Sequence, residues 1–250
     1  MGAGSRILVV GPAWIGDMVM AQSLFRLLHE REPGVMLDVV GPPWSLPLVA
    51  RMPEVRRGIA LAVGHGELGL AARWRLGREL RAERYDRAIV LPRSFKAALV
   101  PVLARIPVRT GYRTELRGLV LDDARKLDRQ RLDQTVKRLL ALGLPPGAPL
   151  PEPPPPRLRI DVANRTALLA RHGLGAGPAV ALRPGAAYGP AKQWPLAHFG
   201  ELARELGVRL DMDAARQLAQ AASNDRALLA RELQFRRLLR RHQKRSRPRG

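Results

Sequence analysis

The sequence has no cysteine, and aromatic residues make up only 4% of its 250 residues. Without cysteine, disulfide bonds, thiolate metal sites and cysteine nucleophiles are excluded, and a reducing compartment is favoured. Long hydrophobic runs are also missing: RILVV, residues 6–10, is too short for the apolar part of a signal peptide. AALVPVLA, residues 97–104, is far shorter than a membrane-spanning helix and contains a proline. We therefore expect a soluble cytoplasmic protein.

Acidic residues are scarce: 22 aspartates and glutamates stand against 43 lysines and arginines, a formal net charge of +21. The positive electrostatic field of such a chain favours polyanionic partners, namely nucleic acid, an anionic membrane face or a phosphorylated substrate. The positive charge is densest from Arg231 to Arg249, where Glu232 is the lone acid. Elsewhere arginines alternate with apolar residues, as they do on an ordinary solvated helix face.

Short apolar runs typical of strands alternate with longer helical patterns. The expected strands cover residues 6–10, 36–41, 58–63 and 86–92, and the expected helices cover residues 17–32, 67–85 and 94–106, the last with a kink at Pro101. In the first helix, Met18, Ala21, Phe25 and Leu28 share one apolar stripe, with Leu24 beside it. This alternation predicts an α/β fold with a parallel sheet covered by helices on both faces.

The segment LGLPPGAPLPEPPPPRL, residues 142–158, is too rich in proline for a helix or a central strand and predicts a semi-rigid linker. After it come an expected helix at 162–173, a strand at 179–184 and a helix at 197–206, but no further strand. About 50 residues cannot form an independent α/β domain. We expect a first domain at 1–144, a linker at 145–157, an incomplete second domain at 158–210 and a basic helical or disordered tail at 211–250.

The loop GPAWIGD, residues 11–17, follows the first expected strand. It has neither the G-x-G-x-x-G spacing of a dinucleotide-binding loop nor the GK[ST] of a phosphate-binding loop. Asp17 near the positive end of a helix is stabilised as an anion. A carboxylate there repels phosphate but can accept a proton from a hydroxyl, as a general base does. The alternative is that Asp17 only caps the helix.

A second loop, RPGAAYGPAKQWP at residues 183–195, has the opposite charge. Gly185 and Gly189 allow close backbone approach, and Lys192 supplies a cation for a diphosphate. Trp194 is either a lid or a core residue, and the core is favoured. A carboxylate and a lysine facing each other across an interdomain cleft suit transfer from a nucleotide-linked donor to a hydroxyl acceptor.

Longer motifs add a family resemblance. They are ILVVGPAWIGDMVMAQSLFRLL, RMPEV, VGHGEL, RYDRAIVLPRSFKAALVP, IPVRTGYRTELRG and PGAAYGPAKQWP. In these the chain resembles the lipopolysaccharide heptosyltransferases, the ADP-heptose glycosyltransferases of family 9. The resemblance implies two Rossmann-like domains of the GT-B type with a cleft between them. It also implies inverting transfer of L-glycero-D-manno-heptose from ADP-heptose to the lipopolysaccharide inner core, without a metal or other cofactor.

The same resemblance implies roles for individual residues. Asp17 matches the proposed catalytic base, and Lys192 matches the lysine proposed to hold the donor phosphates, with Gly185 and Ala186 in the same loop. Residues of the acceptor half that can bind acidic sugars and phosphates are Arg93, Ser94, Lys96 and Arg113, although ordinary surface charge explains them equally well. His65 can line the cleft, but a lone histidine is more often structural.

The sequence departs from the family after about Leu210. The family's second domain continues to a D-[ST]-G-L-M-H-type segment, whereas the aspartates after Lys192 are Asp211, Asp213 and Asp225 in unrelated context. We therefore expect a chain truncated or frameshifted after about residue 210, and its activity stays open.

Several partners follow from these observations. They are ADP-heptose, the lipopolysaccharide inner-core acceptor and the anionic surface of the inner membrane, to which the protein binds peripherally from the cytoplasm. The alternative from another class is a nucleic-acid-binding protein that uses its arginine-rich C-terminal segment. Phe235 is the single aromatic residue of that segment, which makes base stacking poor. A non-functional fragment is the third possibility.

Overall fold

The computed structural model describes residues 4–64, 67–114, 116–174, 180, 182 and 194–205. The chain divides into two compact units, Met1–Asp161 and Val162–Gly250. The predicted donor-loop residues Gly185, Ala186 and Lys192 lie outside the described residues, as do His65 and the basic tail. Most of the strand predicted at 179–184 lies outside them as well.

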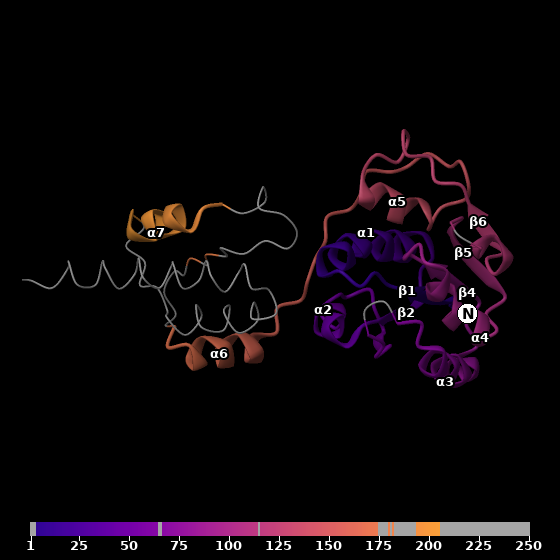
Figure 1. The fold of residues 1–250 in the computed structure, drawn as a ribbon, viewed down its shortest axis with the longest axis horizontal. Helices are drawn as coiled ribbons and strands as arrows, with labels where there is room; N and C mark the ends of the chain where they lie inside the picture. The colour runs from indigo at the N-terminus through magenta and orange to yellow at the C-terminus, as the bar shows by residue number, and fades with distance from the viewer. Residues whose placement is uncertain are drawn as a thin grey trace, which may run out of the picture. The chain divides into compact units, whose positions relative to one another are not determined.

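The first unit is built on a six-stranded parallel sheet with the order β3-β2-β1-β4-β5-β6 (Figure 1). Its strands are β1 Arg6–Val10, β2 Met36–Gly41, β3 Arg57–Ala60, β4 Arg87–Val90, β5 Val108–Tyr112 and β6 Asp123–Arg125. The central strand β1 aligns Leu8 with Asp38 of β2 on one side and with Ala88 of β4 on the other. The predicted parallel α/β sheet is confirmed, and β5 and β6 extend it beyond the prediction.

Helices cover both faces of this sheet, as Figure 1 shows for α1 and α5 on one side and α3 and α4 on the other. The helices are α1 Ile15–Arg31, α2 Leu46–Val49, α3 Leu70–Leu80, α4 Leu99–Leu103 and α5 Thr135–Ala141. Short 3₁₀ helices are η1 Pro43–Ser45, η2 Arg81–Glu83, η3 Phe95–Ala98 and η4 Arg117–Leu119. The predicted apolar stripe of α1 is completely buried, because Met18, Ala21, Leu24, Phe25 and Leu28 all pack against the sheet.

Two predicted helices are shorter in the structure than in the sequence pattern. Gly69, at φ 56°, precedes α3, and Arg84, at φ 50°, follows η2, so left-handed residues end the helical segment on both sides. The segment predicted as one kinked helix at 94–106 instead forms η3 and then α4. Pro101 lies in the first turn of α4, where its missing N–H is not needed, so it does not kink a continuous helix.

The proline-rich segment is attached to α1. Ser23 Oγ donates a hydrogen bond of 2.7 Å to the carbonyl of Pro154, and the backbone N–H of Arg157 donates one of 2.9 Å to Gln22 Oε1. Further along, the N–H of Arg159 donates to the carbonyl of Arg51 at 2.7 Å. These contacts fix the later part of the segment to the first unit, which continues to Asp161.

In the second unit the structure describes the predicted helices α6 Val162–Arg171 and α7 Leu196–Glu205. Trp194, favoured above as a core residue, is 48% exposed and contacts the rings of His198 and Phe199, with ring centres 5.5 Å and 4.8 Å away. None of the helices in the described residues is long and apolar enough to cross a membrane.

Candidate functional site

The carboxyl edge of the sheet is where the candidate residues of the first unit meet. Strand order reverses at β1, which has β2 on one side and β4 on the other. In an open parallel sheet, ligands bind outside the carboxyl ends of the strands at such a switch point. The loop with Asp17 follows β1, Arg93 and Ser94 follow β4, and Arg113 follows β5. Residues far apart in sequence are therefore brought to one edge.

Asp17 is in the first turn of α1 but does not cap the helix. Trp14 occupies the N-cap position, with no side-chain capping hydrogen bond, and Asp17 is the third helical residue. The capping alternative raised from the sequence is thus wrong for this residue. Its half-buried side chain lies in the first turn of a 17-residue helix.

The two glycines of this loop differ in their roles. A Cβ on Gly11 would lie 2.5 Å from Cε of Met18, so glycine here lets Met18 pack beneath the loop. A Cβ on Gly16 would meet no heavy atom within 4 Å. The first glycine is therefore packed against the buried Met18 side chain, whereas the second faces open space.

Backbone and side-chain hydrogen bonds hold the loop after β1 against the loop after β2. The N–H of Gly11 donates to the carbonyl of Val40 at 2.8 Å, and Nε1 of Trp44 donates to the carbonyl of Ala13 at 3.1 Å. The rings of Trp14 and Trp44 remain 51% and 58% exposed. The loop that leads into α1, and so to Asp17 in its first turn, is thus fixed, with indole surface open to solvent nearby.

The predicted acceptor residues lie in neighbouring loops that are also bonded together. Thr114 Oγ1 donates to the carbonyl of Arg93, which joins the loops after β5 and β4. Lys96 Nζ donates to the carbonyl of Glu67 at 3.0 Å, so its ammonium group also ties the segment before α3 to this edge. Arg93 and Arg113 are exposed, and neither guanidinium is hydrogen-bonded or ion-paired within the described residues. Such groups bind carboxylates and phosphates well.

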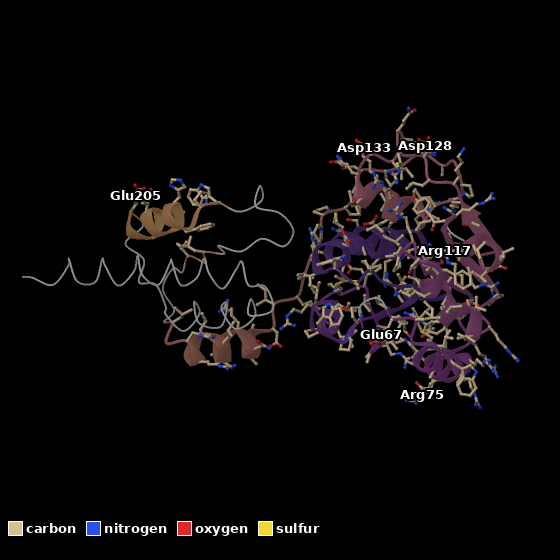
Figure 2. The ribbon with its side chains drawn as sticks, in the orientation of Figure 1. Glu67, Arg75, Arg117, Asp128, Asp133 and Glu205 are labelled. Carbon is tan, nitrogen blue, oxygen red and sulfur yellow. The ribbon has the colours of Figure 1, made fainter. Side chains whose placement is uncertain are left out.

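Arg117 was not singled out in the sequence. It is completely buried in η4, within the connection from β5 to β6, and it is the largest fully buried side chain of the described residues (Figure 2). Its Nη2 lies 3.5 Å from the carbonyl of Val90, and a Cβ on Gly111 would lie 2.9 Å from the same atom. Nothing in the local pattern of TELRG distinguishes this arginine from the many exposed ones. It adds positive charge below the candidate site.

A second charged cluster lies at the amino ends of the strands and is internally paired. The buried carboxylate of Asp38 accepts hydrogen bonds from Tyr85 Oη at 2.5 Å, Arg56 Nε at 2.8 Å and Arg57 Nε at 3.1 Å. Glu83 accepts from Arg56 Nη2 at 3.0 Å and pairs with Arg57 Nη2 at 2.8 Å. We call these five residues the amino-edge network.

The amino-edge network shifts the pKa of its members. Burial acts to raise the pKa of Asp38, but hydrogen bonds from Arg56 and Tyr85, with the charges of Arg56 and Arg57, outweigh it and lower that pKa. Burial and the hydrogen bond to Asp38 raise the pKa of Tyr85. The pKa of Glu83 is lowered chiefly by its hydrogen bond from Arg56. The charged and polar groups of these five residues are hydrogen-bonded or ion-paired with one another, so the amino-edge network is not a candidate ligand site.

Neither a second cavity nor a metal centre competes with the carboxyl edge within the described residues. A hollow of about 300 Å³ lies between β6 and the segment after α5, but its Arg125 is already bonded to Asp123 and to the carbonyls of Ala141 and Leu144. Within the described ranges, no group of three or more histidine, aspartate or glutamate side chains gathers as metal ligands would. The carboxyl edge is therefore the candidate site.

A parallel sheet with a carboxylate at its switch point and cations in the adjoining loops is the acceptor half expected of a sugar-transferring enzyme. Residues 73–210 match the family model of glycosyltransferase family 9 (heptosyltransferase). The chain belongs to glycosyltransferase family 9. The predicted GT-B-type α/β fold class agrees with this membership and with the observed sheet order.

Comparison with individual proteins shows which members of the family the chain is similar to. The chain is 41% identical to lipopolysaccharide heptosyltransferase 2 of Salmonella typhimurium, a match that covers 91% of this chain and 70% of the relative. It resembles the solved structure of E. coli ADP-heptose LPS heptosyltransferase II with a TM-score of 0.71 and 38% identity, over 86% of this chain and 68% of that one. An E. coli heptosyltransferase solved with ADP-2-deoxy-2-fluoro heptose shares the fold, with a TM-score of 0.57, 21% identity and coverage of 82% and 67%.

These comparisons confirm the family resemblance inferred from the motifs. They give no support to the alternative of a nucleic-acid-binding protein. None of them assigns a role to a single residue, so the roles of Asp17, Arg93, Ser94, Lys96 and Arg113 stay predictions.

Proposed function

We propose that this chain transfers a heptose residue from ADP-heptose to the inner core of lipopolysaccharide, with Asp17 as the general base. The observation that carries the proposal is the position of Asp17: first turn of α1, at the switch point, but not the helix cap. The names of the relatives support the substrates, since the Salmonella typhimurium relative is a lipopolysaccharide heptosyltransferase. A neighbour in fold was solved with an ADP-heptose analogue.

In this mechanism the Asp17 carboxylate accepts the proton of the acceptor hydroxyl as its oxygen forms the new bond to the anomeric carbon of heptose. ADP leaves from the opposite face, which inverts the anomeric configuration. Arg93 and Arg113 bind the acidic sugars and phosphates of the acceptor, assisted by Ser94 and by Lys96 of η3, which follow Arg93 in the chain.

The donor side of the proposal rests on residues outside the described ones. Lys192, with the backbone of Gly185 and Ala186, would neutralise the departing diphosphate, so the proposed reaction requires no metal. We further propose that the chain works at the cytoplasmic face of the inner membrane as a peripheral protein. The net charge of +21 favours that anionic surface.

The proposal is tested with the purified full chain, ADP-heptose and a deacylated inner-core oligosaccharide that ends in a single heptose. We expect ADP release matched by an acceptor whose mass rises by one heptose residue, and anomeric inversion by NMR. ADP-glucose serves as the matched donor control. Release of ADP without a change in acceptor mass, or equal use of both donors, would contradict the proposal.

A further inference from the structure

Helix α3 has two faces with different surroundings. Leu76 and Leu80 are buried and pack with β1, β2 and β4. On another side of the helix, Leu70, Trp74 and Arg78 follow one another four residues apart, and Arg81, the first residue of η2, continues this row three residues later. All four are exposed, although Arg81 Nε also donates to the carbonyl of Leu103 at 2.9 Å. We call these four residues the α3 stripe. No packing within the described part of the first unit explains its apolar members.

The exposure of the stripe is large for such side chains. Leu70 is 57% exposed and Trp74 is 51% exposed, and Leu68 just before the helix is 47% exposed. The guanidinium carbon of Arg78 lies 4.7 Å from the centre of the Trp74 ring, so cation and indole are stacked at the surface. The stripe is therefore apolar at the start of the helix and cationic toward its end.

The flanks of α3 strengthen the positive charge. Arg75 projects from the helix away from the sheet (Figure 2) and is exposed. Glu79 is the acidic residue of α3, and it lies one position past Arg78, off the stripe. Arg73 points inward and donates to the carbonyl of Leu68 at 2.7 Å, so it does not contribute to the surface. An anionic partner thus meets little repulsion here.

We propose that the α3 stripe is a membrane-docking surface that binds the anionic face of a phospholipid bilayer. Indole rings prefer the headgroup level of a bilayer, and guanidinium groups bind lipid phosphates. A short helix with an exposed apolar end lies in the interface and does not span it. A nucleic acid would pair with the arginines but would leave Leu68 and Leu70 without a partner. This inference rests on the proposed function at one point: the acceptor of the proposed heptose transfer is a glycolipid.

The stripe is connected to the candidate site. Lys96 Nζ donates to the carbonyl of Glu67, three residues before Leu70. The start of α3 is thereby held to the loop that carries Arg93 and Ser94. Docking of the stripe would bring the carboxyl edge close to the bilayer surface, where an amphiphilic acceptor presents its sugars.

Depth-dependent quenching tests the geometry of docking. The full chain is mixed with phosphatidylcholine vesicles containing phosphatidylglycerol and brominated lipids, without donor or acceptor. We expect the tryptophan fluorescence of the natural chain to be quenched, and most of this quenching to disappear in Trp74→Phe. Trp44→Phe is the matched control and should keep it. Because Trp74 is half exposed, its replacement leaves the fold intact, which circular dichroism checks.

Affinity for the same vesicles tests the charge. Arg78→Gln should weaken binding about fivefold, the effect of one basic side chain near an anionic surface. Arg129→Gln makes the same charge change at an exposed position far from α3, and should have a smaller effect. Neutral phosphatidylcholine vesicles should bind much more weakly.

Three outcomes would overturn the proposal. They are quenching unchanged by Trp74→Phe, equal losses of affinity in Arg78→Gln and Arg129→Gln, and binding to double-stranded DNA that depends on Trp74 as strongly as vesicle binding does. The heptose-transfer assay uses a deacylated acceptor and needs no membrane. Vesicle binding without heptose transfer would therefore contradict only the proposed function. Heptose transfer without vesicle binding would contradict only the docking proposal.

Discussion

The two edges of the sheet carry the same kinds of charged group and use them differently. At the amino ends, Asp38 is completely buried and bonded to Arg56, Arg57 and Tyr85. At the carboxyl ends, the carboxylate of Asp17 has no hydrogen-bond or ion-pair partner among the residues that the structure describes.

The difference separates stability from function. A buried carboxylate must be paired, because desolvation of an unpaired charge costs several kcal/mol, so the amino-edge network is part of the fold. A half-exposed carboxylate keeps water as its partner, and a substrate hydroxyl can replace that water. Substitutions at the two edges should therefore affect different measurements.

The largest effect is expected at Asp17. Asp17→Asn keeps the shape of the side chain but removes the proton acceptor, and general-base loss costs about 10²–10⁴-fold in rate. Since Asp17 is not the N-cap residue of α1, the melting temperature should hardly change. Initial rates of heptose transfer and thermal unfolding measure both. Near-normal turnover of a stably folded variant would show that Asp17 is not the base.

The next effect is expected at Asp38 and concerns stability. Asp38→Asn should lower the free energy of unfolding by about 3 kcal/mol, the low end of the range for breaking a buried ion pair. The low end applies because the side chains of Arg56 and Arg57 are 36% and 44% exposed and stay hydrated. Urea unfolding measures the loss. If the kcat of Asp38→Asn fell as far as that of Asp17→Asn, the two edges would not differ in their effect on activity.

The same carboxylate predicts a pH dependence. Because the pKa of Asp38 in the folded protein lies below its ordinary value of 3.8, its stabilising contribution is complete above that value. It is lost as the pH falls through the lowered folded-state pKa. Urea unfolding of the natural chain and of Asp38→Asn, compared at about pH 6 and about pH 3, should show a difference that shrinks in acid. A constant difference would indicate that packing, not charge, is lost.

A smaller effect is expected for the exposed guanidiniums of the carboxyl edge. Arg93→Gln and Arg113→Gln should each raise the KM for the acceptor by about tenfold, since a charge-assisted hydrogen bond contributes about 1.5 kcal/mol or more. The KM for ADP-heptose and the melting temperature should stay unchanged. Steady-state kinetics with each substrate varied in turn makes the measurement, and Arg129→Gln is the control. An unchanged KM for the acceptor would leave these arginines as ordinary surface charge.

The smallest effect is expected at Trp44. Trp44→Phe removes the indole N–H that donates to the carbonyl of Ala13 and keeps a ring in place. Loss of one neutral hydrogen bond at a half-exposed site costs about 1 kcal/mol or less. We expect a change in kcat within about fivefold, from a looser loop beside Asp17. A loss as large as that of Asp17→Asn would mean that the tryptophan itself takes part in catalysis.

The sequence by itself determined the elements whose signal is local. RILVV predicted β1, the stripe from Met18 to Leu28 predicted the buried face of α1, and the alternation of such segments predicted a parallel sheet. The family motifs then predicted the glycosyltransferase class. For the strand and the helix, neighbours in sequence are sufficient, because side-chain periodicity decides which face is buried. The glycosyltransferase class came from the resemblance of the longer motifs to the family.

The tertiary structure decided everything that depends on distant residues. β5 and β6 were not predicted, because VRTGY and DAR carry charges and become strands only by pairing with their neighbours in the sheet. Arg117 resembles any surface arginine in the sequence, but packing against Val90 of β4 and Gly111 of β5 makes it the largest fully buried side chain of the described residues. The loop motif singled out Asp17, but nothing in MLDVVG predicted that Asp38 would be completely buried and paired. Their roles differ because long-range folding brings two arginines and a tyrosine to one and leaves the other open to solvent.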